Sequence, residues 1–161
     1  MPKYLLDTNA CVGLRNSLRG VGSRDADRQA RHERLIARLR ATPASDLALS
    51  FFVLGELMVW VKKHADPARA AELTRQLTEH VAVLGCPPPA TTSASAAEPG
   101  AYPLAHHYAD IRATLETRGE GIADNDLWIA AHARAFGMTV VTNNTSHFAR
   151  VPGLAVEDWT T

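Results

Sequence analysis

The chain of 161 residues contains little cysteine and no long apolar run. Cys11 and Cys86 are too few for a disulfide framework or a cysteine-based zinc site. No apolar stretch approaches the roughly 20 residues that a membrane-spanning helix needs. The N-terminus lacks the basic, apolar and small-residue pattern of a secretory signal. We therefore expect a cytoplasmic protein that does not enter a membrane.

The sequence also lacks a net charge, because seventeen basic residues balance seventeen acidic ones. The charge is unevenly distributed along the chain. Residues 15–40 contain eight arginines and three acids, a local charge of +5, so the rest of the chain carries −5. Such asymmetry is typical of a phosphate-contacting arm beside an acidic site, although a solvated helix face gives the same pattern.

The length and a hydrophobic content of 46% fit one domain, residues 1–161, with a single core. Apolar patterns and turn residues predict short strands at 3–9, 47–49, 81–84, 139–142 and 154–157. They predict helices at 24–39, 51–64, 67–80, 103–118 and 125–136. Ser50 and Asp66 are expected to cap the second and third of these helices, and Gly137 is expected to end the last one. This alternation predicts a three-layer α/β/α sandwich around a mainly parallel sheet, with the short first strand near its centre. The proline- and alanine-rich stretch 86–100 indicates a mobile loop rather than a domain boundary.

The helix predicted at 51–64 is unusually apolar. The spacing of Phe51, Leu54, Met58 and Val61 places them on one face of the helix. Glycine inside a helix costs about 1 kcal/mol relative to alanine, so a close backbone approach is the expected reason for Gly55. This helix has more apolar surface than one small sheet covers, at Phe51, Met58 and Trp60, the last of which lies off that face. That surplus favours pairing of two chains.

Acidic and amide side chains follow two of the predicted strands and open one of the predicted helices. They are Asp7, Asn9, Asp124, Asp126, Asn143 and Asn144. Ligand sites in open α/β sheets form outside the carboxyl ends of the strands, so these oxygens are expected to converge. Oxygen-rich acidic clusters suit Mg²⁺ or Mn²⁺. Turns and helix caps use the same residue types, and one of Asp124 and Asp126 is expected to be an N-cap.

Four segments in this order resemble the PIN domain family. They are residues 5–9 (Leu-Leu-Asp-Thr-Asn), 52–57 (Phe-Val-Leu-Gly-Glu-Leu), 125–133 (Asn-Asp-Leu-Trp-Ile-Ala-Ala-His-Ala) and 140–144 (Val-Val-Thr-Asn-Asn). Phe148 and the segments 151–154 and 157–159 resemble the VapC-type toxins within this family. The resemblance covers essentially the whole chain, although 20–31 and 86–100 look longer than in compact members.

The resemblance implies a metal-dependent ribonuclease that is homodimeric and has a VapB-like antitoxin as partner. Position by position, it assigns Asp7, Glu56 and Asp126 as catalytic acids, with Asp7 and Asp126 as ligands of Mg²⁺ or Mn²⁺. Thr142 matches the hydroxyl that supports the first acid. Asn144 stands where many members have a fourth Asp, and Asn9 and Asp124 are further supporting residues. Acids crowded together without metal repel one another, so at least one raised pKa is expected.

Cleavage of RNA by in-line attack needs an activated water and a neutralised phosphate, which one or two Mg²⁺ ions provide. An acidic cleft repels RNA, so Arg24, Arg28 and Arg31 are predicted to contact its phosphates. Specificity would then come from unstacked bases of a structured RNA such as tRNA.

Other functions remain open at this point. A phosphatase with an Asp nucleophile is disfavoured, because such enzymes usually have a second Asp where Asn9 stands. A receiver domain is disfavoured as well, because Glu56 would have no role in it. A PIN nuclease outside a toxin–antitoxin pair and a catalytically weak PIN scaffold that binds RNA or protein are the main alternatives. A metal-free histidine ribonuclease is disfavoured, because no histidine has a visible partner in the sequence.

Overall fold

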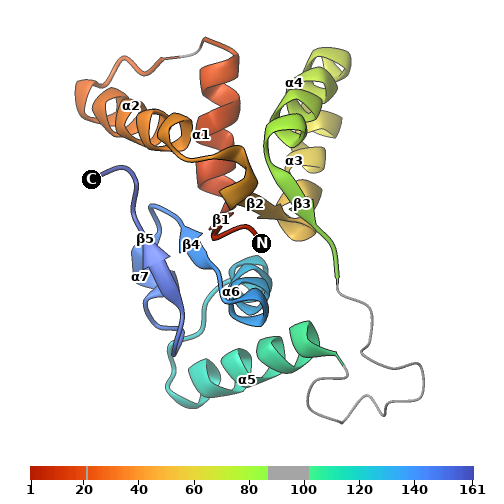
Figure 1. The fold of residues 1–161 in the computed structure, drawn as a ribbon, viewed down its shortest axis with the longest axis vertical. Coiled ribbons are helices and arrows are strands. Elements are labelled where there is room, and N and C mark those ends of the chain that lie inside the picture. The colour runs from red at the N-terminus through yellow and green to blue at the C-terminus, as the bar shows by residue number, and fades with distance from the viewer. Residues whose placement is uncertain (21, 87–101) are drawn as a thin grey trace.

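The protein is described by a computed structural model that covers residues 1–20, 22–86 and 102–161. In these ranges the backbone forms a five-stranded sheet of order β3-β2-β1-β4-β5 (Figure 1). All neighbouring strands are parallel. The strands are β1 (Tyr4–Leu6), β2 (Leu47–Ser50), β3 (Ala82–Leu84), β4 (Thr139–Val141) and β5 (Ala155–Glu157). The loop predicted at 86–100 lies, beyond Cys86, outside the described residues.

Helices cover both faces of the sheet, which confirms the predicted three-layer sandwich. Helices α1 to α4 lie on one side of the sheet, and α5 and α6 lie on the other (Figure 1). Their bounds are α1 (Thr8–Leu18), α2 (Ala26–Ala41), α3 (Phe51–Lys63), α4 (Pro67–His80), α5 (Pro103–Thr117), α6 (Asp124–Phe136) and α7 (Thr145–Phe148), with a 3-10 turn at Ala44–Asp46. None of the described helices is both long and apolar enough to cross a bilayer.

The centre of the sheet is also the point where its connections change direction. From β1 the chain moves outward through β2 to β3, and it returns to the other side of β1 as β4 and β5. Leu6 pairs in register with Val141, so Asp7 and Thr142 leave the sheet side by side. The Asp7 amide donates to the Val141 carbonyl at 3.1 Å. Ligands of open α/β sheets bind at such a switch point, outside the carboxyl ends of the strands.

Helix α1 was not predicted from the sequence. Asp7 ends β1 and caps α1 at once, because its carboxylate accepts the Ala10 amide at 2.7 Å. Gly13 lets α1 pass close to α2, where a Cβ would lie 2.7 Å from a methyl group of Leu35. Polar residues and this glycine give α1 a weak helical pattern, which explains the omission. The predicted caps Ser50 and Asp66 are confirmed at the starts of α3 and α4.

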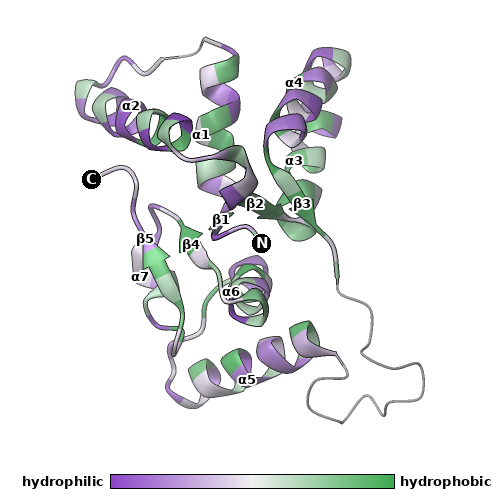
Figure 2. Ribbon diagram, viewed as in Figure 1, coloured by the Kyte–Doolittle hydropathy of each residue, from purple (hydrophilic) through white to green (hydrophobic). Residues whose placement is uncertain are grey.

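The apolar face predicted on α3 is only partly buried. Val61 of that face is buried, together with Val53 and Leu57 outside it, whereas Phe51 and Met58 are 36% and 41% exposed. Most of α3 is apolar (Figure 2), so spacing alone cannot distinguish its inner face from its outer face. The close backbone approach expected at Gly55 is not found, because nothing lies within 4 Å of a Cβ built on this residue.

Helix α6 begins differently from the prediction and ends as predicted. Ala123 is its N-cap and no side chain caps it, so neither Asp124 nor Asp126 is used for capping. Both carboxylates lie in the first turn, where the helix dipole favours negative charge. Gly137 ends the helix with a φ of 64°, a left-handed conformation that glycine adopts readily.

Candidate active site

Asp7 is the most deeply buried acid of the predicted site, with 4% of its surface exposed. One carboxylate oxygen accepts the Ala10 amide, and the other accepts the Thr142 hydroxyl at 2.5 Å. The same Thr142 oxygen accepts the Asn144 amide at 2.8 Å, so the backbone after β4 holds the hydroxyl in place. The expected contact between Thr142 and the first acid is therefore present.

Glu56 lies in the second turn of α3 and is tied to both other acidic segments. It accepts a hydrogen bond from the Thr8 hydroxyl, next to Asp7 in the sequence. It also accepts the side-chain amide of Asn125, next to Asp126, at 2.6 Å. These two bonds join α1, α3 and α6 around one acidic centre. Thr8 and Asn125 were not predicted as site residues; their positions beside the two aspartates were the only available signal.

Asp126 has a histidine partner from α7. Its Oδ2 lies 2.9 Å from His147 Nδ1, and the Asn144 side-chain nitrogen lies 2.8 Å from the same ring atom. The expectation that no histidine has a partner is therefore wrong for His147. It is also wrong for His132, whose Nδ1 lies 2.9 Å from the Ser50 hydroxyl.

His132 and Ser50 are both fully buried, and burial lowers the pKa of His132. This pair has no access to RNA, so it does not support histidine catalysis.

Burial is the main cause that raises the pKa of Asp7, from an ordinary 3.8 to about 6. The negative charge of Asp126 raises it further, while the hydrogen bonds from Thr142 and Ala10 lower it. The acid cluster thus contains the expected raised pKa, but its main cause is burial, and repulsion between the acids contributes less. A buried carboxylate that feels a second carboxylate is a site where positive charge is stabilised.

The donor set fits a hard divalent cation. Each Asp7 oxygen accepts one hydrogen bond and keeps lone pairs free, and Asp126 supplies a second carboxylate. Mg²⁺ typically takes one or two protein carboxylates and keeps several waters. Across the described ranges no three His, Cys, Asp or Glu side chains already converge as ligands. The fit is therefore to two carboxylates plus water, with Glu56 held nearby by Thr8 and Asn125.

The predicted supporting residues occupy different surroundings. Asn9 donates to the Asn143 side chain at 3.1 Å, which bridges the ends of β1 and β4. Asn144 contacts His147, as described above. Asp124 has a 73% exposed side chain and pairs with Arg112 of α5 at 3.2 Å. Asp124 therefore belongs to an ion pair at the edge of the site.

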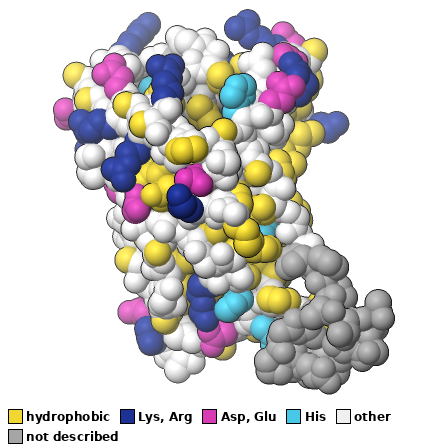
Figure 3. Space-filling view, in the orientation of Figure 1, with side chains coloured by type: hydrophobic (Ala, Val, Ile, Leu, Met, Phe, Trp, Pro, Cys, Tyr) yellow, Lys and Arg dark blue, Asp and Glu magenta, His cyan; other side chains and the backbone are white. Residues whose placement is uncertain are grey.

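The asparagine bridge also borders a hollow of about 720 Å³, which we call the arginine hollow. Its polar lining includes Asn9, Asn16, Arg28, Arg31, Arg34 and Asn143. Arg34 is bound to the carbonyl of Thr160, and Arg38 on the same helix pairs with Glu157. Within the described ranges Arg28 and Arg31 make no ion pair, and they line this hollow together with the acid Asp158. Arg24 is exposed in the turn before α2. Figure 3 shows lysine and arginine gathered over the part of the molecule that α1, α2 and α4 form.

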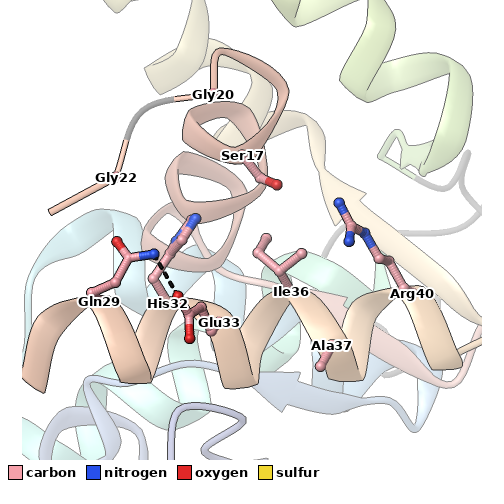
Figure 4. Close-up of a pocket in the computed structure, with 9 residues that line it drawn as sticks. All are labelled: Ser17, Gly20, Gly22, Gln29, His32, Glu33, Ile36, Ala37 and Arg40. Carbon is pink, nitrogen blue, oxygen red and sulfur yellow. Dashed lines mark hydrogen bonds between the residues drawn. The ribbon is translucent and has the colours of Figure 1, made fainter. Parts of the chain in front are cut away.

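Two other hollows contain none of the predicted acids. One of about 470 Å³ lies between α1 and α2, where Gln29 donates to Glu33 (Figure 4). The other, of about 500 Å³, lies among α1, α2 and α4 and has a mostly apolar lining. None of these three hollows is lined by the predicted acids. The arginine hollow is connected to the ends of β1 and β4 through Asn9 and Asn143, which follow these strands and bond to each other.

Comparison with known proteins agrees with this geometry. The family model described as PIN domain matches residues 4–154. The tRNA(fMet)-specific endonuclease VapC of Shigella flexneri is 30% identical over 160 residues, which cover 99% of each chain. Ribonuclease VapC1 of Haemophilus influenzae is 30% identical over 164 residues, with 98% of each chain covered.

Solved structures show the same fold. VapBC from Salmonella typhimurium bound to DNA contains a chain that aligns with a TM-score of 0.77 at 28% identity, covering 99% of both chains. FitAcB from Neisseria gonorrhoeae aligns with a TM-score of 0.71 at 26% identity, covering 97% of both. The family match and the full-length likeness agree with the order of the acidic segments. The chain therefore belongs to the PIN domain family, within the VapC group whose named members are ribonucleases.

Proposed function

We propose that this chain is a Mg²⁺- or Mn²⁺-dependent endoribonuclease and the toxin of a VapBC-type pair. The observation that carries the proposal is the buried Asp7 carboxylate, which feels the charge of Asp126 at the switch point of the sheet. The names of the full-length relatives support RNA as the substrate, and tRNA is the first RNA to test. The whole chain, residues 1–161, would act as one PIN-like domain.

The three acids have two roles in the proposed reaction. Asp7 and Asp126 hold the divalent cation, which, when bound, lowers the pKa of water and neutralises the phosphate oxygens. Glu56, held by Thr8 and Asn125, accepts the proton of the attacking water. The water oxygen bonds to phosphorus, the bond to the leaving ribose oxygen breaks, and that oxygen takes up a proton from solvent. Thr142 keeps Asp7 oriented throughout.

We propose that the bound RNA strand runs from the acidic residues into the arginine hollow. Arg24 lies at the outer end of this path. Replacing Arg28 and Arg31 with alanine is expected to weaken RNA binding. Each phosphate contact on a single strand contributes about 0.7 to the salt slope, so the double variant should lose about 1.4. Binding measured across a salt titration checks this value.

An Arg40→Ala/Arg118→Ala variant removes the same charge outside the arginine hollow and should keep the wild-type slope. An unchanged slope in the Arg28→Ala/Arg31→Ala variant would assign these arginines to another task, such as holding a protein partner. Arg24→Ala alone then tests whether the contact path extends beyond the hollow.

A VapB-like antitoxin is proposed to cover the acids, with one of its arginines paired to Asp7 and Asp126. Complexes named VapBC among the similar structures support such a partner. Expression of the chain alone in bacteria is expected to arrest growth, and co-expression of a small protein encoded directly upstream should restore it. An Asp126→Asn chain at the same expression level is the inactive control. Normal growth despite accumulation of wild-type protein, with no small protein co-purifying, would refute the toxin role.

A homodimer is proposed to bury the outer face of α3. Met58 and Val59 are 41% and 52% exposed there, and Phe51, at the start of the same helix, is 36% exposed. Trp60 is not part of this surface, because the Arg15 guanidinium stacks on its ring at 3.8 Å. Light scattering should report a dimer for the wild type and a monomer for a Met58→Asp/Val59→Asp variant. Leu18→Asp, at an exposed apolar residue of α1, should leave the dimer intact. A wild-type monomer at micromolar concentration would contradict the proposal.

A further inference from the structure

The acids of the site differ in the side chains that hold them. Asp7 is held by a threonine hydroxyl, and Glu56 by a threonine hydroxyl and an asparagine amide. Asp126 is instead held by an imidazole, that of His147. Among the described residues, His147 is the one side chain that hydrogen-bonds to Asp126. The orientation of this carboxylate therefore depends on one contact from a different element.

The position of His147 is itself well determined. It lies in α7, a single turn that directly follows β4, and the next residue, Phe148, is completely buried. Phe148 thus fixes α7 against the core, and the His147 ring is carried to Asp126 with 39% of its side chain exposed. Asp126 Oδ2 faces His147 Nδ1, while Oδ1 makes no hydrogen bond within the described part of the chain. The contact occupies one oxygen and leaves the other available.

The two groups close to His147 Nδ1 indicate which atom is the donor in the hydrogen bond to Asp126. His147 Nδ1 lies within 3 Å of both Asp126 Oδ2 and the Asn144 amide, and one ring nitrogen cannot donate and accept at the same time. An ionised carboxylate is the stronger acceptor, so the Nδ1 proton is directed to Asp126. Rotating the Asn144 amide by half a turn places its oxygen beside the ring, because the two amide atoms exchange positions. Both neighbours then accept from the ring.

We propose that His147 is a positioning residue whose Nδ1–H fixes the Asp126 carboxylate and thereby strengthens cation binding. This inference rests on the proposed function in assigning Asp126 as a ligand, but cation binding can be measured without RNA. Hydrogen-bond partners of ligating carboxylates typically contribute about 10–100-fold in metal affinity or activity. The imidazole acts here through Asp126 and touches neither substrate nor cation.

Two substitutions distinguish the effect of the hydrogen bond on cation binding from the effect of the rest of the imidazole ring. His147→Asn keeps an N–H donor at the δ position, where Nδ1 stands, and removes the rest of the imidazole. His147→Leu places carbon there and removes the donor. Mn²⁺ affinity, measured by electron paramagnetic resonance of the free ion, should fall by about 10–100-fold in His147→Leu. It should stay within about threefold of wild type in His147→Asn, because a hydrogen bond to a charged group needs only a donor in the right place.

Thermal melting in EDTA verifies that each variant folds, and His147→Ala takes the place of His147→Leu if that variant does not. His80→Leu is the matched control, because among the described residues the His80 ring bonds to its own helix, at the Gln76 carbonyl, and should not affect Mn²⁺ binding. Equal affinity in the wild type and both variants would overturn the proposal. An equal loss in both variants would also overturn it, because the ring itself would then be a ligand. A wild-type protein that binds Mn²⁺ but cuts no RNA would refute the proposed function alone.

Discussion

Asp7→Asn and Asp126→Asn are each expected to lose about 10³-fold or more in RNA cleavage, because metal charge stabilisation provides several kcal/mol of the barrier reduction. Asparagine has the shape of aspartate and can still accept the Ala10 amide at position 7. The loss of cleavage would therefore be caused by the missing negative charge and not by loss of the N-cap of α1. Cleavage of a tRNA mixture, followed over time with Mg²⁺ or Mn²⁺, measures it.

Asp110→Asn provides the matched control for these variants. It makes the same chemical change on α5, where Asp110 pairs with Arg134, and should leave cleavage near the wild-type rate. EDTA should stop the wild-type enzyme, and added Mn²⁺ should restore it. Undiminished cleavage by either site variant, or by the wild type in EDTA, would contradict the cation mechanism.

Asp7→Asn is also expected to stabilise the metal-free protein at neutral pH. The folded chain raises the pKa of Asp7 from 3.8 to about 6, so between these values it binds a proton more tightly than the unfolded chain does. The resulting stability is present below pH 3.8 and is lost as the pH rises through about 6. This rise in the Asp7 pKa, from 3.8 to about 6, corresponds to about 3 kcal/mol. Asparagine avoids this cost but forms weaker hydrogen bonds, so a net gain of about 1–3 kcal/mol in unfolding free energy is expected.

Urea unfolding in EDTA at pH 7.5 and at pH 4 tests this sign. The gain in unfolding free energy from Asp7→Asn should be large at pH 7.5 and small at pH 4. Asp110→Asn should have nearly the wild-type unfolding free energy at both pH values. Saturating Mn²⁺ should reverse the order, since a cation that binds only the folded wild type stabilises it. A less stable Asp7→Asn protein at pH 7.5 in EDTA would show that burial does not penalise this carboxylate.

Much of the fold was predictable because it depends on interactions between residues that are close in the sequence. Ser50 and Asp66 are helix caps as expected, and Gly137 ends α6. The apolar runs gave the five strands to within a few residues, and the first strand is central as predicted. These features depend on neighbouring residues in the chain, which is why pattern and propensity were sufficient. Where a segment was almost uniformly apolar, as in α3, the pattern contained no information about which face is buried.

The sequence by itself determined the strands, most of the helices, and the acids at strand ends and at one helix start. Apart from the Thr142 hydroxyl on Asp7, which the family resemblance implied, it could not determine how these acids are held, because the side chains that hold them are far away in the sequence. Glu56 contacts residues 48 and 69 positions away, and His147 reaches Asp126 from 21 positions away. Such contacts depend on the strand order β3-β2-β1-β4-β5, which brings the ends of β1 and β4 together. Tertiary structure alone decided that Asp7 is buried beside a second charge, and desolvation together with that charge raises its pKa.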